Sequence, residues 1–226
     1  MNIKPNWPAP KNIKAFTTTR DAWGELYNNK FDIDKLMQIY QLPNFPTWLD
    51  EIHGIDVIEA TPQNAGQKAD ASYSKTKKNI CMVTTADCLP ILICDKSGTH
   101  VAAIHAGWRG LAAGVIENTI KKLNVPAQDL YVWLGPAIGP KHFEVGTDVY
   151  HAFVAKNAEA QSAFKQQNSN KWLANLYQLA TQRLQQFEIS NIYGGEFCTY
   201  SQTDLFYSYR REKTTGRMAS LIWIDE

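Results

Sequence analysis

Short apolar segments recur along the chain and predict most of its strands. Residues 13–19 read IKAFTTT, a β-branched and alternating segment that is typical of a strand. Further strands are predicted at 56–60, 70–73, 80–85, 90–95, 100–104 and 130–134, and in the tail segments NIYGG, EFCTY, LFYSYR and MASLIWI. The proline-rich residues 1–12 predict a loose or edge-lying lead-in, because proline donates no hydrogen bond to a sheet.

Four segments carry the wider spacing of helices. Asp32 and Asp34 precede KLMQIYQL, which predicts a capped helix ending near Pro43. After His105 the apolar residues fall at helical spacing, with two glycines at the start of the segment: Ala112, Val115, Ile116, Thr119, Ile120 and Leu123, preceded by Gly107 and Gly110. Residues 147–156 and 172–187 are also predicted helical, the latter with one apolar stripe.

Strands and helices alternate here without a strict βαβ rhythm. This mixture favours an α/β (mixed α+β) fold with a mixed β-sheet and flanking helices. No repeat, low-complexity tract or linker divides the 226 residues. The sequence therefore predicts a single domain spanning 1–226, with 1–12 as its lead-in.

Charge and hydropathy exclude several classes of partner. Lys and Arg number 23 against 22 Asp and Glu, a net charge of +1, which argues against a broad basic surface for nucleic acid. No apolar run approaches the roughly 18 residues of a membrane span, and the first residues lack the apolar stretch of a signal peptide. We therefore expect a cytoplasmic protein without nucleic-acid or membrane partners.

Candidate chemistry gathers in three short blocks at predicted strand ends. These are EIHGID (51–56), TTADCLP (84–90) and HAGWRG (105–110), and each contains one borderline metal ligand: His53, Cys88 and His105. Their spacing leaves two interpretations open, either separate turn residues or one shared site. If the three side chains meet, three protein ligands leave a fourth position open, as in catalytic zinc sites.

Charged residues near these blocks add candidates for catalysis and anion binding. Asp87 is adjacent to Cys88 and is placed to orient a ligand histidine, act as a base or cap the turn. Arg109 stands at a predicted helix start, where it either binds an anion or covers Trp108. Arg20 follows one predicted strand, and Arg210 and Arg211 follow another. Each is either a solvated or paired charge or part of a phosphate or carboxylate clamp.

One apparent motif is rejected. His142 and Glu144 have the H-x-E spacing of nucleobase deaminases, but no P-C-x-x-C follows. The deaminase fold is therefore excluded, while Glu144 stays a candidate for substrate binding.

Taken together, the motifs resemble the YfiH / laccase-domain family. The resemblance rests on HG at 53–54, TADC-P at 85–90, HAGWRG at 105–110, GPAIG at 135–139, FEVG at 143–146, CTY at 198–200 and SYRR with GRMASLIW at 208–223. It runs from about Phe16 to the C-terminus. Members have been called polyphenol oxidases, multicopper oxidoreductases, purine nucleoside phosphorylases and peptidoglycan editing factors.

The resemblance implies a fold similar to the catalytic domain of the cytotoxic necrotizing factor toxins. It implies zinc bound by His53, Cys88 and His105, and phosphorolysis of adenosine, inosine and S-methyl-5′-thioadenosine with adenosine deamination as a side activity. Purine nucleoside and phosphate are then the partners of a monomer or homodimer. The predicted catalytic residues are Cys88, His105, Asp87 and Arg109, and the predicted substrate-binding residues are Arg20, Arg109, Glu144 and Arg210.

The chain departs from the family pattern near its start. Relatives carry an Arg-x-Gly-Gly-Val-Ser stretch and then Asn-Leu-Gly, whereas this chain reads TTTRDAWGELYNN, and Asn175 stands where relatives often have Asp. The atypical 20–35 segment affects the loop expected to cover the substrate, and so the choice of substrate.

Two other chemistries fit the same residues. Cys88 as nucleophile with His105 as base would make a hydrolase or amidase that edits peptidoglycan precursors, with or without a metal. A copper-dependent polyphenol oxidase is disfavoured, because five histidines are too few for a four-copper centre. A single copper with two His, one Cys and an axial Met is possible by ligand type, but no Met lies close to either histidine block.

Overall fold

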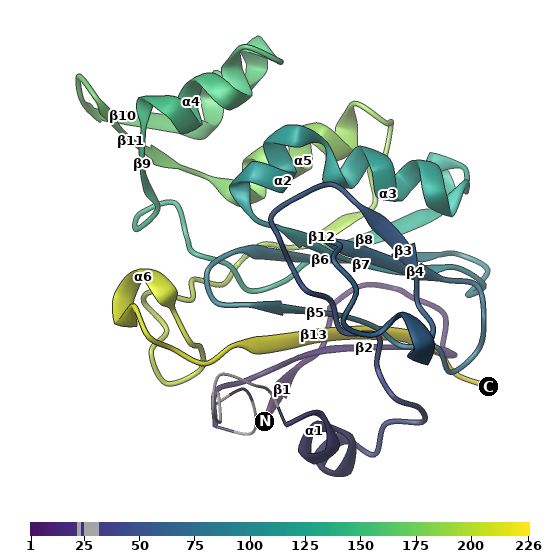
Figure 1. Ribbon diagram of the computed structural model, residues 1–226. Helices are drawn as coiled ribbons and strands as arrows, with labels where there is room; N and C mark the ends of the chain where they lie inside the picture. Colours follow the sequence, from purple (N-terminus) through teal and green to yellow (C-terminus); the bar gives the residue numbers. More distant parts are fainter. Residues whose placement is uncertain (22–23, 25–31) are drawn as a thin grey trace.

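Two β-sheets packed face to face form the centre of the molecule, and helices cover both outer faces (Figure 1). The computed structural model describes residues 1–21, 24 and 32–226. The larger sheet has six strands in the order β12 (Ile192–Gly194), β8 (Leu130–Leu134), β6 (Leu89–Asp95), β7 (Val101–Ala106), β4 (Ala71–Ser74) and β3 (Val57–Glu59). Its outer pairs are parallel and its inner pairs antiparallel, so the predicted mixed sheet is confirmed.

The second sheet is antiparallel and joins the two ends of the chain. Its order is β1 (Asn2–Ile3), β2 (Ile13–Thr18), β13 (Met218–Ile224) and β5 (Cys81–Thr85). The short β1 lies at the edge of this sheet, where it pairs with β2. A smaller three-stranded sheet, β10 (Phe164–Asn168), β11 (Lys171–Ala174) and β9 (Glu144–Gly146), lies at one end beside α4 (Thr147–Val154).

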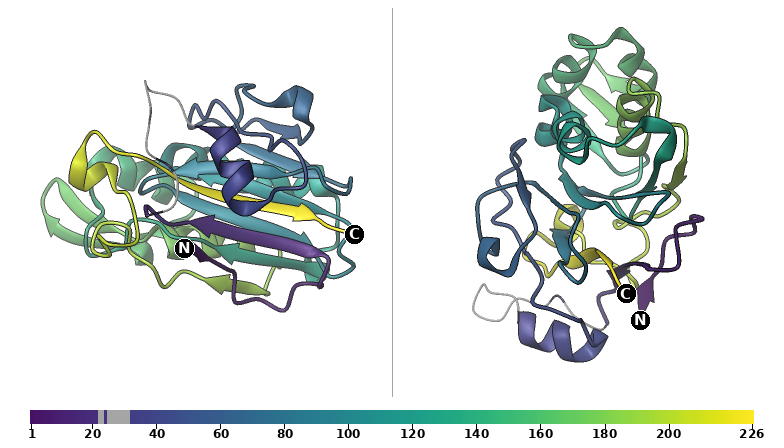
Figure 2. Two further views of the ribbon diagram at one scale, coloured as in Figure 1. Left: turned by 90° about the horizontal axis from the view of Figure 1, so that it is seen from below. Right: turned by 90° about the vertical axis from the view of Figure 1, so that its right-hand side faces the viewer.

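The helices pack on the outer faces of the two large sheets. Helices α2 (Trp108–Ala113), α3 (Val115–Leu123) and α5 (Leu176–Gln185) cover the six-stranded sheet, and α1 (Ile33–Tyr40) lies across the four-stranded one (Figure 2). A short helix, α6 (Tyr209–Glu212), lies in the segment before β13. The 3-10 turns are Pro62–Asn64, Ala127–Asp129 and Ala158–Ala163.

The continuous apolar run of β6 reflects its place between two cores. Ile91 and Ile93 face the helices, while Leu92 and Cys94 face the other sheet. Successive strand residues point to opposite faces, so a strand covered on both sides needs apolar residues at every position. All seven residues of β6 are buried, and each large aliphatic side chain there contributes about 1.5–3 kcal/mol.

Three sequence expectations need correction. Residues 171–174 form strand β11, and the helix predicted over 172–187 begins only at Leu176. The tail segments 196–200 and 205–210 are not strands: residues 196–208 form turns and irregular backbone, and Tyr209 and Arg210 already belong to α6. The helix predicted after His105 is two helices, separated at Gly114, whose φ of 119° is readily adopted by glycine alone.

Candidate metal and anion site

His53, Cys88 and His105 come together although the first and the last are 52 positions apart in the chain. Their ligand atoms all lie within 4.8 Å of one another. Cys88 Sγ is 3.8 Å from His53 Nε2, and the two imidazole rings lie edge to face with centroids 4.8 Å apart. Of the two interpretations that the spacing left open, the structure supports the shared site.

Backbone turns at one end of the sheets bring the three residues together. Cys88 occupies the tight turn between β5 and β6, and His105 lies near the end of β7, paired with Pro90 of β6. His53 sits in a separate turn with a φ of 60°. A Cβ on Gly107 would lie 2.7 Å from the ring of His53 and 3.1 Å from Cys88 Sγ, so the cluster requires glycine at this position.

A buried carboxylate, Asp70, holds both histidines in place. Its Oδ1 accepts hydrogen bonds from His105 Nδ1 at 2.8 Å and from the His53 amide at 2.8 Å. Its Oδ2 accepts from the Gly54 amide at 2.6 Å. Burial opposes ionisation of Asp70, but these hydrogen bonds outweigh it and lower its pKa. Because Asp70 occupies Nδ1, the other ring nitrogen of His105 is left to face the cluster.

The electrostatics of the cluster favour a thiolate. Burial opposes ionisation of Cys88, but the charge of His105 and hydrogen bonds from both histidines lower its pKa to about 6. Burial also opposes protonation of His105, yet the charges of Glu51 and Cys88 and the bond to Asp70 raise its pKa well above the usual value. Cys88 is partly exposed, so the thiolate is accessible.

The residues fit a divalent metal ion. One sulfur and two ring nitrogens are borderline donors of the kind that zinc takes, and four-coordinate ligands of such an ion lie about 3.5 Å apart. The Cys88–His53 separation is close to that value. A carboxylate on the far nitrogen of a ligand histidine is the usual support of such a site. Among the described residues, this is the single cluster with metal-ligand geometry.

A cavity of about 500 Å³ opens over the cluster. Its lining includes all three residues of the cluster. It also includes three arginines (Arg109, Arg210 and Arg217), two carboxylates (Glu51 and Asp87) and three aromatic rings (Trp108, Phe143 and Tyr209). The guanidiniums outnumber the carboxylates, so the cavity is suited to an anion.

Two predicted arginines line this cavity. Arg109 is exposed and stacks on Trp108, with its Cζ 4.3 Å from the ring centroid. Both functions considered for Arg109, covering Trp108 and facing the anion space, are therefore compatible. Arg210 lies 5.4 Å from the Phe143 centroid and donates from Nη1 to the carbonyl of Glu144 at 3.0 Å.

Asp87 lines the cavity, but its carboxylate is engaged by backbone and hydroxyl donors. Oδ1 accepts from Thr199 Oγ1 at 2.6 Å and Oδ2 from the Arg210 amide at 2.7 Å. One function considered for Asp87 was to orient a ligand histidine. In the structure Asp70, not Asp87, makes that hydrogen bond. Asp87 therefore links the Cys88 turn to the segment that carries Arg210.

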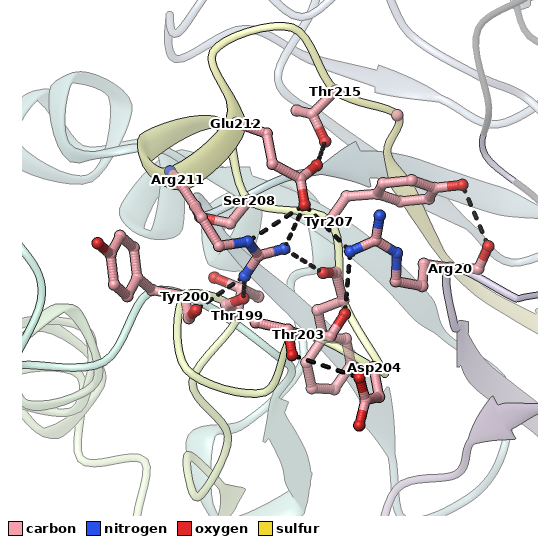
Figure 3. Close-up of polar contacts among 12 residues, drawn as sticks. Arg20, Thr199, Tyr200, Thr203, Asp204, Tyr207, Ser208, Arg211, Glu212 and Thr215 are labelled. Carbon is pink, nitrogen blue, oxygen red and sulfur yellow. Dashed lines mark hydrogen bonds and ion pairs between the residues drawn. The ribbon is translucent and has the colours of Figure 1, made fainter.

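Arg20 and Glu144 do not belong to the cavity lining. The Arg20 guanidinium binds Glu212 at 3.0 Å and the carbonyl of Thr203 at 2.9 Å, and it lies over the Tyr207 ring (Figure 3). The Glu144 side chain pairs with Lys171 at 3.5 Å. Their predicted substrate contacts stay predictions, as does the function of the atypical 20–35 segment, which falls largely outside the described residues.

Sequence reasoning missed several residues of the site. Glu51 and Arg217 line the cavity, and Asp70 supports the histidines. Burial raises the pKa of Glu51, although the charge of His105 and hydrogen bonds from Thr84 oppose the rise. Glu51 stands in the same block as His53, which is the one signal that could have drawn attention to it.

Comparison with known proteins identifies the family of the chain. Residues 19–225 match the family described as multi-copper polyphenol oxidoreductase laccase. The chain belongs to this family. The resemblance noted from the sequence motifs is thereby confirmed.

Relatives in the laccase family cover nearly the whole chain. The chain is 45% identical over 239 residues to the Escherichia coli purine nucleoside phosphorylase YfiH, covering 98% of each chain. It is 46% identical over 241 residues to a Pseudomonas aeruginosa purine nucleoside phosphorylase, covering 99% of this chain and 98% of the relative. A Neisseria meningitidis crystal structure matches with a TM-score of 0.93 and 42% identity over 100% of this chain and 99% of that one.

The mixed α/β fold class is confirmed by these structural neighbours. YlmD from Geobacillus stearothermophilus shares the fold with a TM-score of 0.82 at 24% identity, covering 97% of this chain and 94% of its own. Within the described part of this laccase-family chain, no helix combines the length and apolarity needed to cross a membrane.

Proposed function

We propose that this protein is a zinc-dependent purine nucleoside phosphorylase of the cytoplasm. The observation that carries the proposal is the His53, Cys88 and His105 donor set in the lining of a cavity that also presents three arginines. A metal-binding cluster beside several guanidiniums suits a small, highly charged anion, and inorganic phosphate is the anion a phosphorylase requires. Relatives 45–46% identical carry the name of this activity.

Phosphorolysis exchanges one bond for another at the sugar. A phosphate oxygen bonds to the anomeric carbon of the ribose, while the bond from that carbon to the base breaks. The bonding electron pair leaves with the base, which takes up a proton, and the phosphate gives up one proton on becoming the sugar phosphate ester. When bound, zinc supplies a Lewis acid that polarises an oxygen at the cluster.

The residues of the chain bind and orient in this reaction. Arg109, Arg210 and Arg217 hold the phosphate and offset its charge. Asp70 keeps the Nδ1 proton of His105 in place, so that the ring orientation is fixed. Asp87 fixes the Arg210 backbone relative to the Cys88 turn.

We propose adenosine, inosine and S-methyl-5′-thioadenosine as substrates, with deamination of adenosine as a side activity. The test incubates the metal-loaded protein with each nucleoside, with and without phosphate, and separates free base, sugar phosphate and deaminated nucleoside. Phosphate-dependent release of adenine and ribose 1-phosphate from adenosine is expected, and Cys88→Ala should abolish it. Wild-type turnover equal to that of Cys88→Ala would refute the proposal.

A second candidate is a cysteine hydrolase or amidase acting on peptidoglycan precursors. The lowered pKa of Cys88 beside the raised pKa of His105 favours it, because such a pair is typical of a thiolate nucleophile. Chelation separates the two candidates. A Cys–His dyad keeps its activity after metal removal, whereas the zinc enzyme loses it and recovers when zinc is returned.

Metal analysis tests the third possibility, a copper oxidase. The described residues hold one three-ligand cluster, which suits a single ion rather than the several coppers of a laccase. We expect about one equivalent of zinc and no laccase activity after loading with copper.

A further inference from the structure

Tyr209 is an exposed aromatic ring on the wall of the cavity. Four large hydrophobic side chains of the described residues are exposed, namely Met1, Ile39, Ile52 and Tyr209. Of these, Tyr209 has 56% of its surface exposed and is the one that lines the cavity. An exposed aromatic ring beside a polar cavity is a common feature of ligand-binding surfaces.

Each of the other two cavity aromatics packs against the core and has a guanidinium over its ring. Trp108 is covered by the guanidinium of Arg109, and Phe143 by that of Arg210. Tyr209 has no ring or cation contact with any residue that the structure describes. Among the three aromatic rings that line the cavity, the Tyr209 ring is therefore the one that is free to stack on a planar group of a ligand.

Dense polar contacts around Arg211 and Glu212 hold the segment that contains helix α6 (Figure 3). Tyr209 opens helix α6, and Ser208 caps that helix by accepting from the Arg211 amide. The Arg211 guanidinium donates to the carbonyls of Thr199, Tyr200 and Phe206, each at 2.8 Å, and to Glu212 at 2.7 Å. Glu212 also binds Arg20 at 3.0 Å, which connects the helix to the end of β2.

This support also fixes Tyr209 relative to the metal-binding cluster. The amide of Arg210, the next residue, donates to Asp87, which directly precedes Cys88 in the chain. The Tyr209 backbone is thus connected to the candidate ligand Cys88 through Arg210 and Asp87. An aromatic ring on a fixed backbone loses little further entropy when a ligand stacks on it.

We propose that Tyr209 stacks on the purine base and determines the preference of the site for a planar heteroaromatic leaving group. This inference rests on the proposed function and extends it to a specific residue. Stacking of a base on an aromatic side chain is independent of the substituents of the base, which agrees with a site that takes both adenosine and inosine. The arginines would then bind the phosphate, while Tyr209 binds the base.

The test compares Tyr209→Ala, Tyr209→Phe and the matched control Ile39→Ala, which shortens an exposed side chain on α1. The KM for adenosine at saturating phosphate should rise about tenfold in Tyr209→Ala, with kcat changed by less than about twofold. Tyr209→Phe and Ile39→Ala should stay within about twofold of wild type in KM, because both retain an aromatic ring at position 209. Metal content and melting temperature verify that each variant is folded and loaded.

Titration with free adenine separates this inference from the proposed function, because the free base cannot be phosphorolysed. The dissociation constant of adenine should rise about tenfold in Tyr209→Ala alone. If wild type binds adenine through Tyr209 but shows no phosphorolysis, the stacking site stands and the proposed function falls. An unchanged KM and adenine affinity in Tyr209→Ala would overturn the inference, as would a wild type that fails to bind adenine, or a Tyr209→Phe as impaired as Tyr209→Ala.

Discussion

Asp70 acts on two ligands of the candidate metal site at once. It is fully buried, and its two oxygens accept from His105, His53 and Gly54. An asparagine has similar volume but replaces one acceptor oxygen with a donor, so one of these bonds becomes a clash between two donors. If the amide nitrogen takes the Oδ2 position, the clash falls on the Gly54 amide and disturbs the turn that carries His53. The remaining oxygen is neutral, so it accepts more weakly from His105 and His53.

We therefore expect Asp70→Asn to bind zinc about 10- to 100-fold more weakly than wild type, the usual effect of losing such a carboxylate. A competitive titration with a chromogenic chelator measures the affinity. Asp129→Asn is the matched control, since Asp129 is a half-exposed carboxylate paired only loosely with Lys96. Equal zinc affinity in Asp70→Asn and wild type would show that Asp70 does not support the ligands.

The sequence pointed to Asp87 as a site residue but not to Asp70. Asp87 attracted attention because it adjoins Cys88, whereas Asp70 lies in a short segment, with no metal ligand beside it in the chain. The contact of Asp70 with His105 depends on β4 lying beside β7, where Ala71 pairs with Ile104. Strand pairing of this kind is a long-range property that no local spacing encodes.

At the scale of elements, the sequence predicted strands better than it predicted helix ends. Apolar strands such as β5, β6 and β7 were located within one or two residues because burial on both faces leaves a continuous apolar run. The helix predicted over 172–187 starts too early because Trp172 fits the helical stripe, yet residues 171–173 pair with β9. Asn175 caps the true helix by accepting from the Gln178 amide, a signal that was available in the sequence.

The turn between β6 and β7 depends on one carboxylate. Asp95 accepts from the amides of Thr99 and His100 at 2.7 and 2.9 Å, and from the hydroxyls of Thr99 and Ser97. Burial opposes ionisation, but these hydrogen bonds lower the pKa of Asp95 to about 2. A carboxyl with a lower pKa in the folded state stabilises the protein above its unfolded pKa and loses that contribution as the pH falls.

Asp95→Asn should therefore reduce the free energy of unfolding at pH 7 by about 1–2 kcal/mol. The difference from wild type should stay constant down to about pH 4 and shrink as the pH falls towards 2. Urea unfolding of both proteins at pH 7, 5, 4 and 3 measures it. A difference that stays the same or grows at pH 3 would contradict the assigned cause.

At the scale of the whole molecule, the candidate metal site joins segments that are far apart in the chain. The family motifs in the sequence predicted its three candidate ligands, while their spacing alone left a shared site undecided. The fold supplies the missing step: the β5–β6 turn, the end of β7 and the 51–56 turn meet at one end of the sheets. Further segments, including α2 and α6, supply arginines that line the cavity over the cluster.

A metal bound to three such segments should stabilise the folded chain. Binding to the native state alone adds about 2.7 kcal/mol when free metal is a hundredfold above its dissociation constant. For a chain of 226 residues, this corresponds to a rise in melting temperature of about 5–10 °C. We expect chelation to lower the melting temperature by that amount, and zinc to restore it.

Two variants separate this effect from nonspecific metal binding. Cys88→Ala removes a ligand, so its melting temperature should no longer respond to chelator or zinc. Cys198→Ala removes another partly exposed thiol that lies outside the cluster and should respond like wild type. Scanning calorimetry of all three proteins decides the matter: if Cys88→Ala still gains stability from zinc, the metal binds elsewhere and the three segments are not joined by it.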